Sequence, residues 1–362
     1  MRVVVLGGLG NFGSRICRRL SREPGIQVIT TGRRARERDA ASGAYERIDL
    51  NAPDFKLALR ALRPDLVIHC VGPYQGQDYR VVSAALECGA HYIDLADGRE
   101  FVSRFAVQNH AAALRAGRAA ITGASTLPAL SSAVVDHLLS RFVHVEEIHI
   151  AIAPGQNAPR GTATIGGVLG YAGRGFPWWE DGRWRTAYGW QELRRIRFPF
   201  GTRWAAACDV PDLTLFPDRY AGVRTVTFRA ALEVPVQHFA LWCIAGLRRI
   251  GVPLPVERWA QAFNHAAGWL NRFGTDCGGM RVSLLGTDAS DHRRYSTWYV
   301  LARSNHGPEI PCMASVLLAR KLAEAGPVSS GALPCVGLLT LSEFESEFAR
   351  WDMETSIEDG PA

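Results

Sequence analysis

The stretch VVVLGGLGNFGSRICRRL, residues 3–20, decides the predicted fold. A β-branched run leads directly into a G-x-G-x-x-G pattern at Gly8, Gly10 and Gly13, and apolar residues at helical spacing follow. This strand–turn–helix context separates a dinucleotide-binding turn from an ordinary glycine-rich turn. In such a turn the first glycine permits the tight bend, the second lets a pyrophosphate approach the backbone, and the third allows close helix–strand packing. The sequence therefore predicts a phosphate site at the N-terminus of the first helix.

The rest of the first 125 residues alternates strand and helix patterns, which predicts parallel strands joined by crossover helices. We expect an α/β fold with an N-terminal Rossmann domain, a doubly wound parallel sheet, over residues 1–145. The predicted strands lie at 2–8, 26–32, 45–50, 65–72, 91–97 and 119–125. The predicted helices lie at 11–23, 52–62, 78–89 and 99–117.

The second half has a different texture, with apolar and polar residues alternating as in strands that have one solvated face. It predicts an α+β substrate or dimerisation domain with an antiparallel sheet over residues 146–305. Helices within 306–352 are expected to pack back on the Rossmann domain, and 353–362 to form a frayed tail. A capping box in TLSE, 340–343, opens the last helix.

Composition narrows the function classes. The 362 residues carry a net charge of +6, but Lys56 and Lys321 are the only lysines and both lie in polar segments. Imine chemistry on a lysine is therefore disfavoured, and without a basic stripe no nucleic-acid partner is expected. The eight cysteines form no CxxC pair and show no metal-ligand spacing, so we expect reduced thiols in a cytoplasmic protein and no metal site.

The end of the second predicted strand indicates which nicotinamide cofactor is preferred. NAD sites usually place an acidic residue there, whereas this chain has Arg33 and Arg34. Two guanidinium groups suit a 2′-phosphate, so NADP is expected over NAD. The alternative is that both arginines are merely solvated. Asp49, at the end of the third strand, either flanks the adenine or is an ordinary surface acid.

The segment CVGPYQGQDYRVVSAALECGAHYIDLADGREFV, 70–102, together with GGLGNFG, 7–13, resembles the saccharopine dehydrogenase/reductase family. This resemblance implies a Rossmann domain, a substrate domain and NAD(P)-dependent hydride transfer to or from an imine carbon. Two positions depart from the family pattern: Leu127 stands where the lysine-pathway enzymes have an acid, and Ile165 where they have a cysteine. We therefore expect a substrate that is less polar than saccharopine.

Three residues are candidates for the chemistry. Tyr74 resembles the family's active-site tyrosine, and the alternative is an aromatic wall of the cofactor pocket. Asp97, just past the fifth strand, is either a polar group of the active site or the N-cap of the next helix. His306 is either a candidate acid–base group or a hydrogen-bonding residue of its loop. The predicted cofactor contacts are Gly8, Gly10, Asn11, Phe12, Gly13, Arg33, Arg34, Asp49, Val71, Gly72, Pro73 and Ala96.

A tryptophan-rich passage left three interpretations open. Trp178, Trp179, Trp184 and Trp190 fall among glycines and prolines. They could line an apolar substrate pocket, dock on a partner or membrane surface, or pack within a small domain.

The leading hypothesis is an NADP-dependent oxidoreductase acting on a small-molecule substrate. The rivals are a noncatalytic NADP-binding sensor and a membrane-peripheral protein, and a homodimer is compatible with each.

Overall fold

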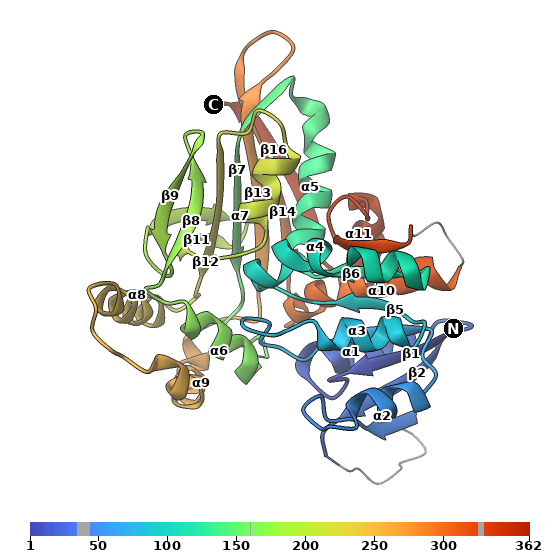
Figure 1. Ribbon diagram of the computed structural model, residues 1–362. Coiled ribbons are helices and arrows are strands. Elements are labelled where there is room, and N and C mark those ends of the chain that lie inside the picture. Colours follow the sequence, from blue (N-terminus) through green and yellow to red (C-terminus); the bar gives the residue numbers. More distant parts are fainter. Residues whose placement is uncertain (35–43, 160, 325–328) are drawn as a thin grey trace. The chain divides into compact units, whose positions relative to one another are not determined.

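The computed structural model describes residues 1–34, 44–159, 161–324 and 329–362, which form two compact units (Figure 1). Unit 1 comprises Met1–Leu130 and Glu309–Leu339, and unit 2 comprises Ser131–Pro308 and Thr340–Ala362. The chain thus leaves unit 1 earlier than predicted, at residue 130 instead of 145.

Unit 1 is built on a parallel sheet, sheet A, with strand order β15-β6-β5-β4-β1-β2-β3 over the described residues. Buried aliphatic residues fill β1, β4 and β6, as expected for strands covered on both faces. The predicted Rossmann fold is confirmed. Its strands are β1 (Arg2–Leu6), β2 (Gln27–Gly32), β3 (Ala44–Arg47), β4 (Leu66–His69), β5 (His91–Asp94), β6 (Ala119–Thr122) and β15 (Gly331–Pro334). Its α-helices are α1 (Asn11–Leu20), α2 (Phe55–Ala61), α3 (Arg80–Glu87), α4 (Arg99–Ala116) and α10 (Ile310–Ala323).

The C-terminal return to unit 1 includes a strand that the sequence did not predict. β15 pairs with β6 in parallel register, Ala332 opposite Ala120. It has only four residues and ends in proline, so no alternating pattern marks it. Before it, α10 lies beside α1, where Arg15 forms an ion pair with the buried Glu309. The packing predicted for the C-terminal helices therefore holds for α10.

Unit 2 is built on sheet B, with strand order β10-β11-β12-β7-β13-β14-β16 and the hairpin β8–β9 attached to β12. Its strands are β7 (His144–Ala153), β8 (Gly175–Glu180), β9 (Arg183–Tyr188), β10 (Arg194–Phe198), β11 (Gly201–Ala207), β12 (Thr225–Ala231), β13 (Gly278–Thr287), β14 (Arg293–Ala302) and β16 (Glu354–Pro361). Its α-helices are α5 (Ser131–Leu138), α6 (Thr162–Gly170), α7 (Asp212–Arg219), α8 (Pro235–Arg249), α9 (Ala260–Trp269) and α11 (Leu341–Phe348). The sheet is mixed rather than purely antiparallel, because β12 returns beside β7 in parallel.

The helices at both ends of unit 2 correct the predicted domain boundaries. α5 belongs to unit 2, where Ser131 donates a hydrogen bond to the buried Asp212 at the start of α7. α11 begins at the predicted capping box, with Thr340 and Glu343 reciprocally bonded. It too belongs to unit 2, because Phe348 packs on Trp298 of β14.

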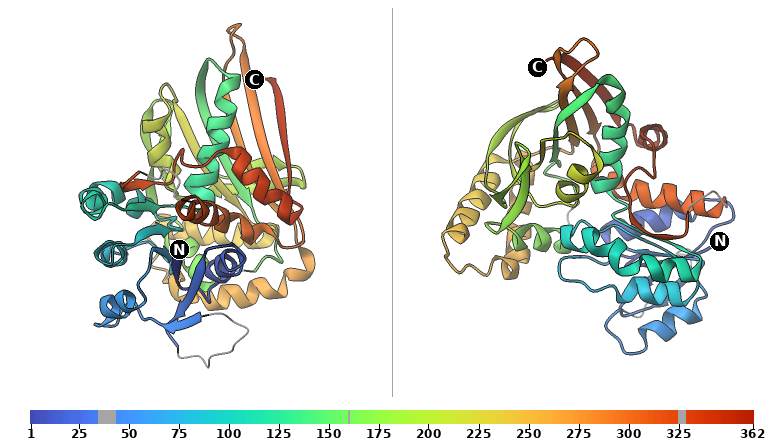
Figure 2. Two further views of the ribbon diagram at one scale, coloured as in Figure 1. Left: turned by 90° about the vertical axis from the view of Figure 1, so that its right-hand side faces the viewer. Right: turned by 45° about the horizontal axis from the view of Figure 1, so that its top comes forward.

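The predicted frayed tail is wrong. Residues 354–361 form β16, which pairs antiparallel with β14 from Glu354 opposite Leu301 to Pro361 opposite Arg294. Figure 2 shows β16 running along β14 at the edge of sheet B. Backbone hydrogen bonds, not apolar burial, hold this edge strand, so its polar sequence resembles a disordered tail.

The tryptophan-rich passage forms the hairpin β8–β9 and the turn after it. Trp178 and Trp190 are buried, and the Trp179 indole donates to the carbonyl of Val223 at 2.9 Å. Trp184 is exposed and packs on Trp179. Three of the four tryptophans therefore contribute to the packing of unit 2, and the passage is not a tryptophan-lined loop.

Candidate dinucleotide-binding site

The glycine turn between β1 and α1 has the geometry of a phosphate cradle. Gly7 adopts a φ of +75°, and the N–H of Gly10 donates to the Gly7 carbonyl at 2.9 Å. The N–H of Gly8 donates to the carbonyl of Thr31 on β2, which fixes the turn against the sheet. The N-cap of α1 is Gly10, which has no side chain to occupy the N–H groups of the first helical turn.

The glycines of this turn are required for different reasons. A Cβ on Gly13 would lie 2.3 Å from the Gly7 carbonyl oxygen, and one on Gly8 would lie 2.8 Å from Thr30 Cγ2. A Cβ on the exposed Gly10 would meet only the Gly7 oxygen, at 3.2 Å. Gly8 and Gly13 thus hold the fold, whereas Gly10 keeps open the space in front of the helix N-terminus. The N-terminus of a helix after such a turn is where dinucleotide-binding folds hold a pyrophosphate.

Asn11 and Phe12 form the first helical residues behind this space. Both are half-buried, and the Phe12 carbonyl accepts a weak hydrogen bond from the Cys312 thiol at 3.6 Å. That contact ties the start of α1 to α10, within the same unit.

The arginines after β2 are exposed, and β3 fixes their backbone. Arg47 Nε donates to the Arg33 carbonyl at 3.1 Å, and the Tyr45 hydroxyl donates to the Arg34 carbonyl. Arg47 thereby adds a third exposed guanidinium at the ends of β2 and β3, which was not among the predicted cofactor contacts. Its signal was an arginine in the short strand YERIDL.

Asp49 is a turn residue in the structure. Its carboxylate accepts the N–H of Asn51 at 3.0 Å, and its carbonyl accepts the N–H of Ala52. The half-buried Asp49 thus forms an Asx turn at the end of the third strand, and its contact with an adenine stays a prediction.

The loop after β4 holds the predicted Val71, Gly72 and Pro73. The Gln77 amide donates to the Val71 carbonyl at 2.8 Å and to the Pro73 carbonyl at 2.7 Å, so the loop is clamped from within. Val71 also lies against Gly7, where a Cβ would come within 2.8 Å of its Cγ2. The loop therefore packs directly on the glycine turn.

Tyr74 is buried, and its hydroxyl is hydrogen-bonded within the protein. The side chain is 5% exposed, and its hydroxyl donates to the carbonyl of His69 at 2.6 Å. Burial raises the pKa of this phenol well above its usual value, so it stays protonated on that bond. The ring packs on His69 and Phe101. The structure supports the alternative that Tyr74 is an aromatic wall of this region.

A buried carboxylate that the sequence analysis overlooked organises the loops after β5 and β6. Asp94 Oδ1 accepts hydrogen bonds from the N–H groups of Ala96 and Gly123 and from the Thr122 hydroxyl, at 2.8–2.9 Å. Burial raises the pKa of Asp94 to about 6. The sequence feature that marks Asp94 is an acidic residue inside the buried strand HYID. The N–H of the buried Ala96 is bound here, so the predicted contact of Ala96 with a cofactor would have to use its carbonyl or side chain.

Asp97 is exposed at the carboxyl end of β5, and its carboxylate hydrogen-bonds the Gln75 side chain from the loop after β4. The N-cap of α4 is Gly98, so Asp97 does not have the capping role considered from the sequence. An exposed carboxylate therefore lies at the edge of sheet A where parallel α/β folds bind ligands.

Other predicted residues lie elsewhere. His306 belongs to unit 2, where its Nδ1 bonds the Trp351 carbonyl at 2.8 Å and its ring packs on the indole. This matches the alternative that His306 is a hydrogen-bonding loop residue. Leu127 is buried in unit 1 before Pro128, and Ile165 is half-buried on α6 in unit 2.

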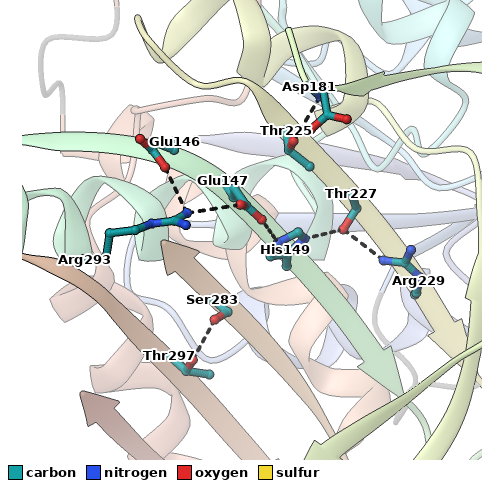
Figure 3. Close-up of polar contacts among 10 residues, drawn as sticks. All are labelled: Glu146, Glu147, His149, Asp181, Thr225, Thr227, Arg229, Ser283, Arg293 and Thr297. Carbon is teal, nitrogen blue, oxygen red and sulfur yellow. Dashed lines mark hydrogen bonds and ion pairs between the residues drawn. The ribbon is translucent and has the colours of Figure 1, made fainter. Parts of the chain in front are cut away.

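Sheet B carries a polar row of its own (Figure 3). His149 bridges Glu147 and Thr227, with 2.8 Å from each ring nitrogen to its partner oxygen. Arg229 donates to the same Thr227 hydroxyl at 3.1 Å and lies over the Trp178 ring. Because both nitrogens of His149 have partners within the row, the row stabilises the sheet and offers no free base.

No three His, Cys, Asp or Glu side chains in the described part of the chain are grouped so that they could hold a metal ion. None of the described helices is long and apolar enough to cross a bilayer.

The fold and the glycine turn of unit 1 define a nicotinamide dinucleotide-binding domain. Residues 3–123 match the family model described as saccharopine dehydrogenase NADP binding domain, which confirms the resemblance for this part of the chain. A search of curated protein sequences finds no significant match.

Two solved structures share the fold over nearly the whole chain. Saccharopine dehydrogenase (L-Glu forming) from Saccharomyces cerevisiae aligns with a TM-score of 0.69 at 12% identity, covering 99% of each chain. Homospermidine synthase from Legionella pneumophila, solved with NAD, aligns with a TM-score of 0.62 at 10% identity, covering 99% of this chain and 90% of the other. At these identities the likeness establishes the fold and no shared activity.

Proposed function

We propose that the protein is an NADP-dependent oxidoreductase that transfers hydride to or from the carbon of a C=N or related C=O group. One observation carries this proposal. A Cβ on Gly8 or Gly13 would collide with neighbouring atoms, whereas one on Gly10 would meet only the Gly7 oxygen, at 3.2 Å. Packing of a turn alone does not require this open space at Gly10, but a pyrophosphate at the N-terminus of α1 does.

The preference for NADP rests on Arg33 and Arg34. Both side chains are exposed after β2, where NAD sites usually place an acid. A 2′-phosphate there would gain charge-assisted hydrogen bonds, and Arg47 adds to the positive charge at the same edge.

The bound nicotinamide would supply or accept the hydride, and the chain would supply position and proton control. In the reductive direction, the carbon of the C=N group would receive the hydride and its nitrogen one proton. The product would be an amine, and the oxidised cofactor would be NADP⁺. We assign the proton-handling or substrate-positioning role to Asp97, the exposed carboxylate beside Gln75. Tyr74 acts as a positioning residue that links the β4 loop to the end of β5 through its buried hydroxyl.

The substrate is expected to be less charged than saccharopine. Leu127 and Ile165 offer no hydrogen bond or charge where the resembling enzymes have polar groups, and charged groups lose hydration at apolar walls without compensation. We therefore propose a cofactor site like that of the family and a substrate site without two of its polar groups.

The test is NADPH oxidation followed at 340 nm with a panel of aldehydes and ketones, each with and without an amine, beside NADP⁺ reduction with saccharopine. We expect turnover with apolar members of the panel and none in the Gly10→Val variant. Tight NADPH binding without turnover on any panel member would favour the noncatalytic sensor. Efficient saccharopine oxidation would contradict the substrate assignment.

A further inference from the structure

The solvent-facing side of helix α8 in unit 2 is as apolar as its buried side. His238, Leu241 and Ala245, three and four residues apart, are buried on the side toward β11. On the opposite side, residues at the same spacings are exposed, and none is charged or strongly polar: Val236, Ala240, Cys243, Leu247 and Ile250. A helix on a water-exposed surface normally carries polar side chains there. Some partner is therefore expected to cover this side of α8.

A second apolar stripe lies on α9 and the turn that follows it. Ala262, Ala266 and Trp269 are exposed at helical spacing, with Phe273 just beyond. Trp269 is 80% exposed and Phe273 63%, which is unusual for large aromatic side chains. Figures 1 and 2 show α8 and α9 at the same corner of unit 2. We call this surface the α8–α9 face: Val236, Trp242, Cys243, Leu247, Ile250, Val252, Trp259, Trp269 and Phe273.

Arginine is the commonest charged residue around the α8–α9 face. Residues 233–276 contain four arginines and three acidic residues, of which Glu233 is paired with Arg203. The Arg249 guanidinium lies 4.2 Å from the Tyr188 ring centroid, and that of Arg272 lies 4.7 Å from the Phe273 centroid. Tyr188 is half-buried and Phe273 is exposed. Cations beside aromatic rings suit the headgroup level of a bilayer, where apolar and charged groups meet.

An open pocket adjoins the α8–α9 face. It has a volume of about 390 Å³ and is lined by Arg174, Arg248, Val252 and Leu254, among others, and by no described acidic residue. Gly173 is part of the pocket lining and packs closely on α8. A Cβ at this position would lie 2.3 Å from the Ala245 carbonyl oxygen. The pocket lining thus combines two arginines with apolar residues. The arginines suit a phosphate, and the apolar residues suit a hydrocarbon chain attached to it.

The same charges disfavour a second copy of the chain as the occupant. A twofold dimer through this face would place its arginines against the identical basic surface of the partner. An anionic membrane surface instead complements both the arginines and the apolar stripes. α8 has 15 residues and none of the described helices can span a bilayer, so the face would lie on the membrane.

We propose that the α8–α9 face docks unit 2 on a membrane surface containing anionic lipid. The apolar stripes enter the boundary between headgroups and acyl chains, and the pocket at Arg174 and Arg248 receives a lipid phosphate. The proposal does not depend on the oxidoreductase function, and it replaces the hairpin β8–β9 as the candidate membrane contact.

Flotation with vesicles of phosphatidylcholine alone, and of phosphatidylcholine with an equal amount of phosphatidylglycerol, tests the proposal. The wild-type chain should float with the mixed vesicles and much less with the neutral ones. Trp269→Ser and Phe273→Ser should each lower the partition coefficient about tenfold, which corresponds to about 1.4 kcal/mol. Arg249→Gln and Arg272→Gln should each lower it about fivefold on the anionic vesicles only.

Matched controls lie on the hairpin β8–β9. Trp184→Ser and Arg183→Gln remove an exposed aromatic and an exposed cation outside the face, and should leave flotation unchanged. Melting curves check that every variant folds. Equal flotation on neutral and anionic vesicles, or none on either, would overturn the proposal. So would light scattering that shows a wild-type dimer dissociated by Trp269→Ser, because a second copy would then cover the face.

Discussion

Substituting two glycines of the same turn should separate cofactor binding from folding. Gly13→Ala is expected to destabilise unit 1, whereas Gly10→Val is expected to leave it folded and unable to bind NADPH. The difference follows from the surroundings of each glycine. A Cβ on Gly13 meets the Gly7 backbone at 2.3 Å, whereas one on Gly10 points into the open cradle.

The magnitudes follow from these distances. Because Cβ contacts below 3.0 Å are essentially never seen, Gly13→Ala must move α1 and the turn apart by at least about 0.7 Å. No side chain can rotate away, so overpacking costs about 3 kcal/mol, offset by about 1 kcal/mol of better helix propensity. The net loss of about 2 kcal/mol should lower the melting temperature by about 4–8 °C.

Gly10→Val has the opposite profile. Its backbone, with φ of −74° and ψ of 173°, suits any residue, so the stability should change by no more than about 1 kcal/mol. The valine methyls would occupy the pyrophosphate space and remove about two charge-assisted hydrogen bonds. That loss of about 3 kcal/mol or more corresponds to a rise in Kd for NADPH of at least about 100-fold.

Differential scanning calorimetry and isothermal titration with NADPH would measure both effects, with Gly10→Ala as the same-substitution control for Gly13→Ala. A folded Gly10→Val variant that binds NADPH with wild-type affinity would refute the cradle. A Gly13→Ala variant as stable as the wild type would refute the packing argument.

Three further predictions concern the loops at the carboxyl edge of sheet A. Burial raises the pKa of Asp94 to about 6, so its protonation favours the folded state, and this contribution is lost as pH rises from 4 to 7. The unfolding free energy of the wild type relative to Asp94→Asn should fall by about 3 kcal/mol over that range, and urea titrations showing no change would contradict the burial argument. Tyr74→Phe should cost about 1 kcal/mol of stability by leaving the His69 carbonyl unpaired. The pH profile of kcat should be the same in Tyr74→Phe as in the wild type. If the variant lost the acidic or the basic side of that profile, Tyr74 would be a proton donor after all. Asp97→Asn should lower kcat at least about tenfold with unchanged Kd for NADPH, and unaltered steady-state kinetics would remove Asp97 from the mechanism.

The Rossmann half was predictable from sequence because its signals are local. A buried β-branched strand, the three glycines and the following helix are contiguous, and each crossover helix repeats the pattern. The capping box at Thr340 and Glu343 was predictable for the same reason, because its two residues are three positions apart. β15 and β16 were missed because partners far along the chain stabilise them through backbone hydrogen bonds.

Site residues were predictable in kind but not in orientation. The sequence placed Tyr74 after β4, but only the structure shows its hydroxyl bound to the His69 carbonyl instead of facing outward. Asp94 and Asp97 lie in one short segment, and only the structure shows that Asp94 anchors two loops while Asp97 is exposed beside Gln75. No spacing rule encodes which of two neighbouring acids is buried.

The NADP preference can be measured by isothermal titration of NADPH and NADH into the wild type and the Arg33→Ala/Arg34→Ala variant. We predict that the wild type binds NADPH more tightly than NADH. We also predict that the double variant loses about 2–4 kcal/mol of that preference, because the 2′-phosphate loses its charged hydrogen bonds. Equal affinity of the wild type for the two cofactors, or binding of neither, would contradict the prediction.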